Sequence, residues 1–240
     1  MESTHFYRVL YVLVHAIYTI VEVIWNATLW IVREFELIHS RYKNVRKRLF
    51  TLSKTPKHLT VIVGHDDCSL RDLTNLIIWC IAVEIPYISF YDFKGKLKKE
   101  EERFRSMVES QKHSTDHIVW HRTAGTYKNG FVGRKIHVKI LTEEDGRENI
   151  VNLTKELAVD RDRANGISIE SINGWLLERF EFPDPDMGLV CGGRLHILNY
   201  PPWQLRLTEF FRLNDLSNIT FSSFLDYLEM FSKCEQRVGT

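Results

Sequence analysis

The first 40 residues carry a hydrophobic pattern that predicts one long helix. From Phe6 to Val32 almost every residue is apolar or aromatic, and about 27 residues at 1.5 Å each are enough to cross a bilayer core. Polar residues recur within it at spacings of four, three and four, at His15, Thr19, Glu22 and Asn26. This spacing places them in a single stripe on one helix face. The alternatives are a spanning helix and a helix lying in the membrane plane with its stripe facing water.

The balance of insertion energies favours the spanning helix. Glu22 near the middle costs roughly 2.5 to 3.5 kcal/mol, while about a dozen Leu, Ile and Val residues at −0.3 to −0.6 kcal/mol each offset that cost. No small-x-small cleavage site follows the apolar run, so we expect the helix to be retained.

The hydrophobic pattern changes after residue 57 and predicts a folded domain. The apolar run His58–Gly64 is typical of a buried strand, and Ser69 with Asp72 three residues later is typical of a helix start. Pro86 should stop that helix, and Tyr87–Tyr91 reads as a second strand. A strand, helix, strand unit closes as a right-handed parallel crossover, so we expect parallel strands.

The remaining pattern extends the same architecture. Further strands are expected at Ile136–Leu141, Met187–Cys191 and Glu209–Leu213, with a strand-like stretch at Ile118–Trp120, and helices at Lys96–Lys112, after Asp145-Gly146, after Ser168 and after Thr220; Thr123–Lys135 is expected to be a surface loop. The fold class is therefore α/β, a parallel sheet covered by helices on both faces and preceded by a membrane helix. We divide the chain into an N-terminal helix (1–40), a basic linker (41–57) and a folded domain (58–240).

The net charge of the whole chain is only +1, which excludes a broad electrostatic attraction to nucleic acid. Charge therefore has to be considered region by region. Basic residues cluster after the membrane helix with no acidic residue between Ser40 and His58: Arg41, Lys43, Arg46, Lys47, Arg48, Lys54 and Lys57. The positive-inside bias places the folded domain in the cytosol, and the cluster can contact anionic headgroups. A nuclear-localisation or nucleic-acid patch is the alternative.

Cysteine and histidine spacing gives no metal motif. Cys68, Cys80, Cys191 and Cys234 are widely spaced, and we interpret them as buried reduced thiols. His113, His117 and His121 lie four residues apart, but the strand-like residues between the last two would scatter them over two faces. Asp66 and Asp67 could bind a metal, although helix capping is the favoured role.

The segment Asn199–Phe211 contains Asn199-Tyr200, followed by Trp203-Gln204 and, after four intervening residues, Glu209-Phe210. This Trp-Gln-x-x-x-x-Glu-Phe spacing resembles the pattern of the cis-prenyltransferases. Other signatures of that family are missing. Three replacements fall where family members hold a diphosphate with charged side chains: Val190 for Arg, Arg194 for Glu and His196 for Arg. The family's Asp-Gly-Asn-Gly-Arg is replaced by His65-Asp66-Asp67-Cys68-Ser69, and its Phe-Ser-x-Glu-Asn-Trp segment by Tyr91–Gly95.

These departures, together with the terminal Arg237-Val238-Gly239, resemble the Nogo-B receptor family, the non-catalytic subunit of dehydrodolichyl diphosphate synthase. The resemblance implies a heterodimer, or a heterotetramer, with a catalytic cis-prenyltransferase subunit at the endoplasmic reticulum membrane. That synthase condenses isopentenyl diphosphate with farnesyl diphosphate, and its product feeds dolichol synthesis and protein glycosylation. The subunit is not catalytic alone, and Mg²⁺ is held mainly by the partner.

The resemblance also implies roles for individual residues. Arg237 and Gly239 would help bind isopentenyl diphosphate in trans, and the partner interface would include Trp203, Arg206, Leu207, Glu209 and Phe210. From the residues alone, a frayed terminus is the alternative for the tail. A receptor or scaffold with a degenerate enzyme fold, or a self-sufficient enzyme, remains the alternative for the whole chain.

Overall fold

The computed structural model describes residues 2–40, 52–63, 69–121, 134–160, 167–192, 195–213 and 219–235. The chain divides into two compact units, residues 1–45 and 46–240. The predictions for Asp66, Asp67, Cys68, Arg194, Arg237, Gly239 and linker residues 41–51 lie outside the described residues.

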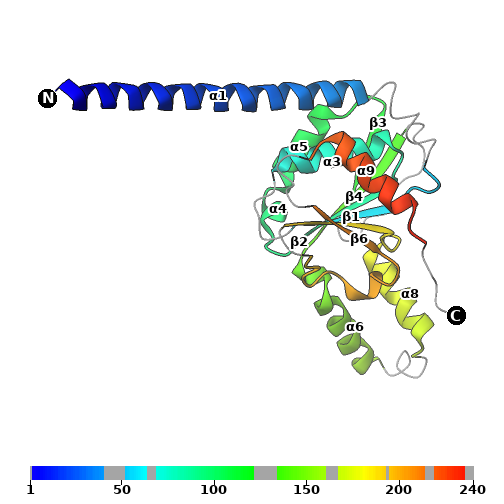
Figure 1. Ribbon diagram of the computed structural model, residues 1–240. Coiled ribbons are helices and arrows are strands. Elements are labelled where there is room, and N and C mark those ends of the chain that lie inside the picture. Colours follow the sequence, from blue (N-terminus) through cyan, green and yellow to red (C-terminus); the bar gives the residue numbers. More distant parts are fainter. Residues whose placement is uncertain are drawn as a thin grey trace. The chain divides into compact units, whose positions relative to one another are not determined.

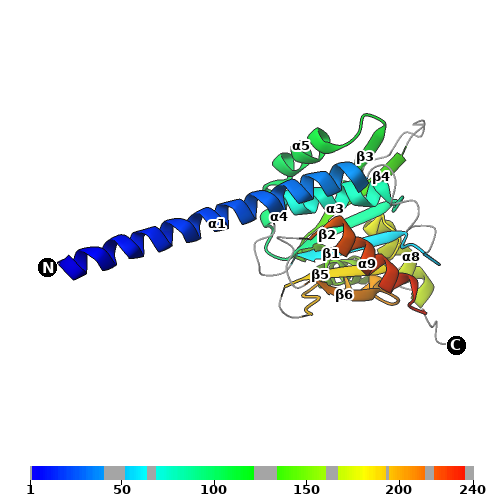
Figure 2. The ribbon, with the colours of Figure 1, turned by 45° about the horizontal axis from the view of Figure 1, so that its top comes forward.

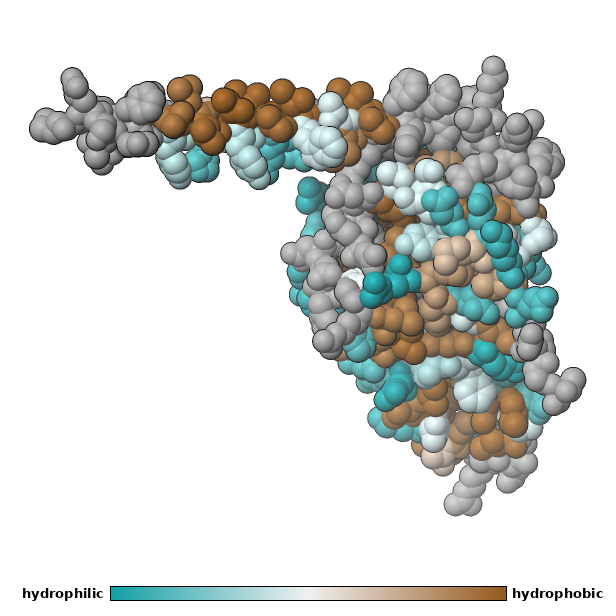
Figure 3. Space-filling view, in the orientation of Figure 1, coloured by the Kyte–Doolittle hydropathy of each residue, from teal (hydrophilic) through white to brown (hydrophobic). Residues whose placement is uncertain are grey.

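The described part of the first unit is one helix, α1 (Glu2–Ser40). Its stretch Leu10–Leu29 is long and apolar enough to cross a membrane and is unburied along its length. Figure 3 shows that apolar side chains cover one side of this stretch and polar ones the other. The predicted stripe is therefore present, and within it Thr19 Oγ1 donates to the carbonyl oxygen of His15 at 2.9 Å.

The second unit is a six-stranded parallel sheet, which confirms the predicted α/β class. The strands are β1 (His58–Val63), β2 (Tyr87–Asp92), β3 (Asp116–Trp120), β4 (Arg134–Leu141), β5 (Met187–Cys191) and β6 (Glu209–Leu213). Their order across the sheet is β3-β4-β2-β1-β5-β6, and all five neighbouring pairs are parallel. β6 and β3 therefore form its edges.

Helices cover both faces of this sheet (Figures 1 and 2). One face carries α3 (Leu70–Ala82), α5 (Glu101–Gln111) and α9 (Phe221–Ser232), and the other carries α6 (Arg147–Val159) and α8 (Ile169–Phe180). Short helical pieces complete the unit: α4 (Lys96–Lys99), η1 (Glu143–Asp145) and η2 (Pro202–Gln204). The strand residues alternate between the two faces. Phe90 contacts Phe104 of α5, while its neighbour Tyr91 contacts Tyr200 on the opposite side.

Three predicted helix starts are confirmed by their caps. Ser69 Oγ accepts from the Arg71 N–H at 3.2 Å, Ser168 Oγ from the Ser171 N–H at 3.1 Å, and Thr220 Oγ1 from the Ser223 N–H at 3.2 Å. Each hydroxyl satisfies a main-chain donor that the helix itself leaves unpaired.

Some predicted boundaries were wrong. The helix predicted over Lys96–Lys112 is two helices, because Glu100 ends α4 with its N–H to Lys96 O and begins α5 with its carbonyl to Phe104 N–H. The helix before Pro86 already ends at Ala82, since Glu84 has a positive φ of 62°. The end of the predicted loop, Arg134 and Lys135, belongs to β4, where Arg134 Nη2 lies 2.7 Å from Asp116 Oδ1 of β3. The rest of that loop lies outside the described residues.

The cysteine prediction holds for two residues and fails for one. Cys80 and Cys191 are buried and form no disulfide among the described residues, but Cys234 is half-buried because it lies beyond the end of α9. Burial raises the pKa of the Cys80 thiol far above its ordinary value.

Candidate functional site

Parallel α/β sheets bind ligands at the carboxyl ends of their strands, and three strands end side by side here. β1 lies between β2 and β5, with Val63 opposite Asp92 and Ile62 opposite Val190. This edge corresponds to the region in which the family resemblance places the diphosphate, so its side chains decide what the site can hold.

The carboxylate at the end of β2 is engaged by its own main chain. Asp92 Oδ1 accepts from the Lys94 N–H at 3.0 Å, and Oδ2 from the Leu97 N–H at 2.5 Å. The side chain is buried and fixes the turn into α4, whose N-cap Gly95 has a φ of 65°. Asp92 therefore has a structural role at the place where a metal-binding or diphosphate-binding site would need a ligand.

The end of β5 is apolar. Val190 is 1% exposed and belongs to a core cluster that fills the α6/α8 side of the sheet: Ile62, Tyr91, Leu141, Phe180, Phe182, Val190 and Tyr200. The rings of Tyr91 and Tyr200 meet edge to face at 5.3 Å. Burial, with Glu143 nearby, raises the pKa of Tyr91 to about 12. The cation described on this face, Lys139, is used within the core, because its Nζ donates to the carbonyl oxygen of Phe180 at 2.6 Å.

A chain of buried polar side chains crosses the sheet beneath this cluster. His58 Nδ1–H donates to the carbonyl oxygen of Pro183 at 2.6 Å, and His58 Nε2 lies 2.8 Å from Ser89 Oγ. Ser89 Oγ lies in turn 3.0 Å from Thr60 Oγ1. All three side chains have no exposed surface, so substrate cannot reach them and their role is structural. Burial lowers the pKa of His58 to about 4, which keeps the ring neutral.

Two further histidines pair at the neighbouring strands. His121 Nε2 lies 2.7 Å from His137 Nδ1, and Tyr87 stacks on the His137 ring at 4.8 Å. Burial, together with nearby positive charge, lowers the pKa of both histidines to about 4. The structure thus joins His121 to His137, while His113 hydrogen-bonds Thr115 Oγ1 at 2.8 Å. Within the described part of the chain, no three His, Cys, Asp or Glu side chains could hold a metal together.

The predicted interface residues lie around η2 and β6, and the structure does not test their role. Trp203 is half-buried: its Nε1–H donates to Asn173 Oδ1 at 3.1 Å, and its ring packs on the cluster of Leu153, Leu157 and Leu176 between α6 and α8. Arg206 and Leu207 are exposed. Burial raises the pKa of Asp184, and the charge of nearby Arg206 offsets part of that rise. Glu209 and Phe210 are half-buried on the edge strand, with Phe210 against the core cluster.

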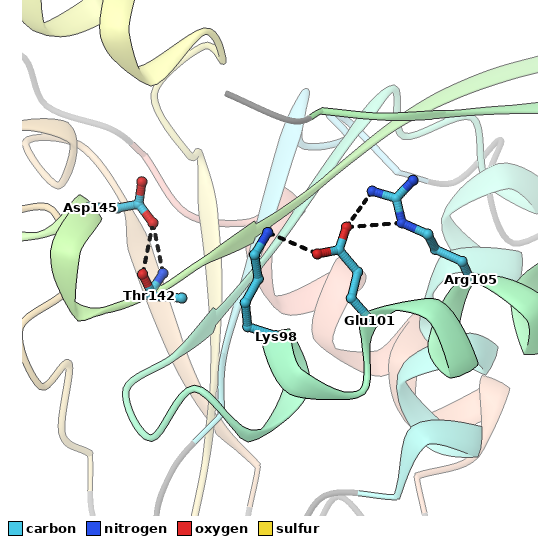
Figure 4. Close-up of polar contacts among 5 residues, drawn as sticks. All are labelled: Lys98, Glu101, Arg105, Thr142 and Asp145. Carbon is cyan, nitrogen blue, oxygen red and sulfur yellow. Dashed lines mark hydrogen bonds and ion pairs between the residues drawn. The ribbon is translucent and has the colours of Figure 1, made fainter. Parts of the chain in front are cut away.

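Carboxylates at the start of α5 and in η1 are held by local polar contacts (Figure 4). Glu101 accepts from Lys98 Nζ at 2.8 Å and from Arg105 Nε at 2.9 Å, and Thr142 N–H donates to Asp145 Oδ2 at 2.8 Å. Burial raises the pKa of Glu101, but these two cations outweigh it and hold the pKa below its ordinary value. Arg105 also lies 4.8 Å over the ring of Trp120, which ties α5 to β3.

Comparison with known proteins places this geometry in a family. A mouse protein, subunit Nus1 of the dehydrodolichyl diphosphate synthase complex, is 30% identical over 201 residues, which cover 79% of this chain and 67% of the mouse protein. The chain belongs to this family of Nus1 subunits. A Schizosaccharomyces pombe Nus1 subunit is 29% identical over 212 residues, covering 81% of both chains. No family model matches the chain.

Solved structures confirm the fold of the second unit. Lavandulyl diphosphate synthase from Lavandula x intermedia aligns with a TM-score of 0.56 at 14% identity, over 76% of this chain and 98% of that enzyme. A probable undecaprenyl diphosphate synthase from Campylobacter jejuni aligns with a TM-score of 0.52 at 15% identity, over 77% and 98%. At these identities the likeness concerns the fold alone.

Proposed function

We propose that this chain is the non-catalytic, membrane-anchoring and activating subunit of a dehydrodolichyl diphosphate synthase. Membership of the Nus1 family supports the complex, and the burial of Val190 in an aromatic cluster is the observation that supports the non-catalytic role. A diphosphate at this strand end would need cations and main-chain donors, whereas Val190 is packed there in an apolar and aromatic cluster and Asp92 carries the same sign of charge as the ligand.

The chemistry then belongs to a catalytic cis-prenyltransferase partner, which would condense isopentenyl diphosphate with farnesyl diphosphate. Mg²⁺, when bound, would neutralise diphosphate charge. Asp92 is buried and its carboxylate holds the turn into α4 through the Lys94 and Leu97 N–H groups, and among the described residues no group of three His, Cys, Asp or Glu side chains could hold the ion. We therefore assign Mg²⁺ mainly to the partner.

The contribution of this chain to the shared site would be its last residues. Arg237 offers a guanidinium fork and Gly239 lets main-chain donors approach oxygen closely, a combination suited to isopentenyl diphosphate bound by the partner. The apolar stretch of α1 and the basic run after it support anchoring in the endoplasmic reticulum membrane with the folded unit in the cytosol.

The test is turnover by the complex purified from cells that co-express both subunits. Arg237→His and deletion of Gly239-Thr240 should each lower kcat/KM for isopentenyl diphosphate by about tenfold to a hundredfold, since one charge-assisted contact to phosphate is lost. The KM for farnesyl diphosphate and the yield of complex should stay unchanged. Arg103→His, an exposed arginine of α5, is the matched control. Wild-type rates for the Arg237→His complex over a full isopentenyl diphosphate titration would refute the role in trans.

A further inference from the structure

Ser53 and Lys54, in the last part of the basic run, contact the carboxyl end of α9. Ser53 Oγ donates to the carbonyl oxygen of Ser232 at 2.6 Å. Lys54 Nζ donates to the carbonyl oxygen of Cys234 and lies 4.7 Å from the centre of the Phe231 ring. The contact joins residues 180 positions apart, one next to the membrane-proximal segment and the other near the end of the chain.

Cations are favourable near this helix end, because helix carbonyls at a carboxyl end carry partial negative charge. The last turn of α9 contains no basic residue, and its C-cap is Lys233. Lys54 adds a cation from elsewhere in the chain and a hydrogen bond to the carbonyl oxygen of Cys234, just beyond the helix. Phe231, the ring beneath its ammonium group, is 2% exposed, so the lysine is held against a fixed part of the core.

The position of this contact in the chain gives it a consequence. Cys234 and Glu235 are the last described residues, and the tail residues Arg237 and Gly239 follow them in the sequence. We propose that Lys54 is a positioning residue that fixes the base of this tail and so sets how Arg237 meets isopentenyl diphosphate in the partner. This inference rests on the proposed function of the tail.

The same contact distinguishes Lys54 from Lys57, the other described member of the basic run. Its ammonium group is half-buried and used within the protein, whereas Lys57 is exposed and makes its contact through the main chain, with its N–H 2.7 Å from Asp186 Oδ2. Lys57→Ala therefore removes the same charge from the same segment while keeping its structural contact. It is the matched control for Lys54→Ala.

The first measurement is steady-state kinetics of the two-subunit complex in detergent, without added lipid. Lys54→Ala should lower kcat/KM for isopentenyl diphosphate roughly three- to tenfold, the effect of losing one charged hydrogen bond. Lys54→Arg should retain most of the wild-type value, because a guanidinium can donate to the same carbonyl and lie over the same ring. Lys57→Ala, the yield of complex and the KM for farnesyl diphosphate should be unaffected.

The second measurement combines Lys54→Ala with deletion of Gln236–Thr240. If Lys54 acts through the tail, it should cause no further loss in the tail-deleted complex. An equal loss in both backgrounds would mark a purely structural role and overturn the inference, as would an effect seen only when anionic vesicles are added. If tail deletion alone changed nothing, the proposed function of the tail would fail instead, so the two ideas fail separately.

Discussion

The ring of Phe210 lies directly against the α-carbon of Gly188. A methyl group added at Gly188 would stand 2.3 Å from Phe210 Cδ1, well inside van der Waals contact. Gly188 of β5 is paired with Phe210 of β6, so the missing side chain leaves the place that the ring occupies on the edge strand. Phe210, a predicted interface residue, therefore packs with one side of its ring against its own domain.

Gly188→Ala should consequently destabilise the folded unit. Forcing the ring away costs about 1 to 3 kcal/mol of unfolding free energy, as overpacking usually does. Urea unfolding of the full chain in detergent, followed by tryptophan fluorescence, measures it. Gly174→Ala is the control, because no atom lies within 4 Å of the added methyl in that exposed helical position. It should raise stability by up to about 1 kcal/mol. A neutral Gly188→Ala would show that the strand edge adapts freely.

Leu207 and Trp203 should differ in how they affect assembly. Leu207 is 37% exposed, so Leu207→Ala should weaken co-purification with the catalytic subunit and leave the urea midpoint of the isolated chain unchanged. Trp203→Ala should weaken both co-purification and stability. Loss of an aromatic anchor should cost about 2 kcal/mol or more of binding free energy. Loss of the hydrogen bond to Asn173 should lower the urea midpoint of the isolated chain. Met230→Ala, exposed on α9, is the control. Unaltered co-purification of both variants would place the interface elsewhere.

Topology can be tested with glycosylation. Asn152-Leu153-Thr154 is a sequon on exposed α6, yet a cytosolic domain never meets the lumenal transferase, so endoglycosidase should leave the mobility of the membrane-expressed protein unchanged. A sequon in an added N-terminal extension should be glycosylated if α1 spans the membrane, and unmodified if α1 lies in its plane. Modification at Asn152 would place the folded unit in the lumen.

The fold was predictable because its signals are local. β5 and β6 match the predicted ranges Met187–Cys191 and Glu209–Leu213, and the caps at Ser69, Ser168 and Thr220 depend on neighbouring residues. The site was less predictable, because its decisive contacts join distant positions. A single sequence does not show that Lys54 donates a hydrogen bond to the carbonyl oxygen of Cys234. It also does not show that Phe210 packs against Gly188. The family resemblance identified the missing charge at Val190, but only the structure shows that a core cluster fills this position.

The buried histidines predict a loss of stability in mild acid. The pKa of His58 falls from 6.5 to about 4 on folding because burial disfavours the imidazolium, so the unfolded chain binds the proton more readily. The contribution of neutral His58 to the free energy of unfolding is fully present above pH 6.5. It is lost as the pH falls towards 4, by up to about 1.4 kcal/mol per pH unit. His121 and His137 act in the same direction.

His58→Gln isolates this contribution. The glutamine amide keeps hydrogen-bonding groups near Pro183 and Ser89 but does not titrate, so the slope of unfolding free energy against pH between 6.5 and 4 should become shallower than in the wild type. Ser89→Ala is the control: it removes the two hydrogen bonds of Ser89 Oγ, to His58 and Thr60, and leaves the buried imidazole, so it should lower stability by about 1 to 3 kcal/mol without removing the slope. Urea midpoints of the full chain in detergent at stepped pH give both numbers. If His58→Gln kept the full wild-type slope, the acid sensitivity would have to come from the His121 and His137 pair.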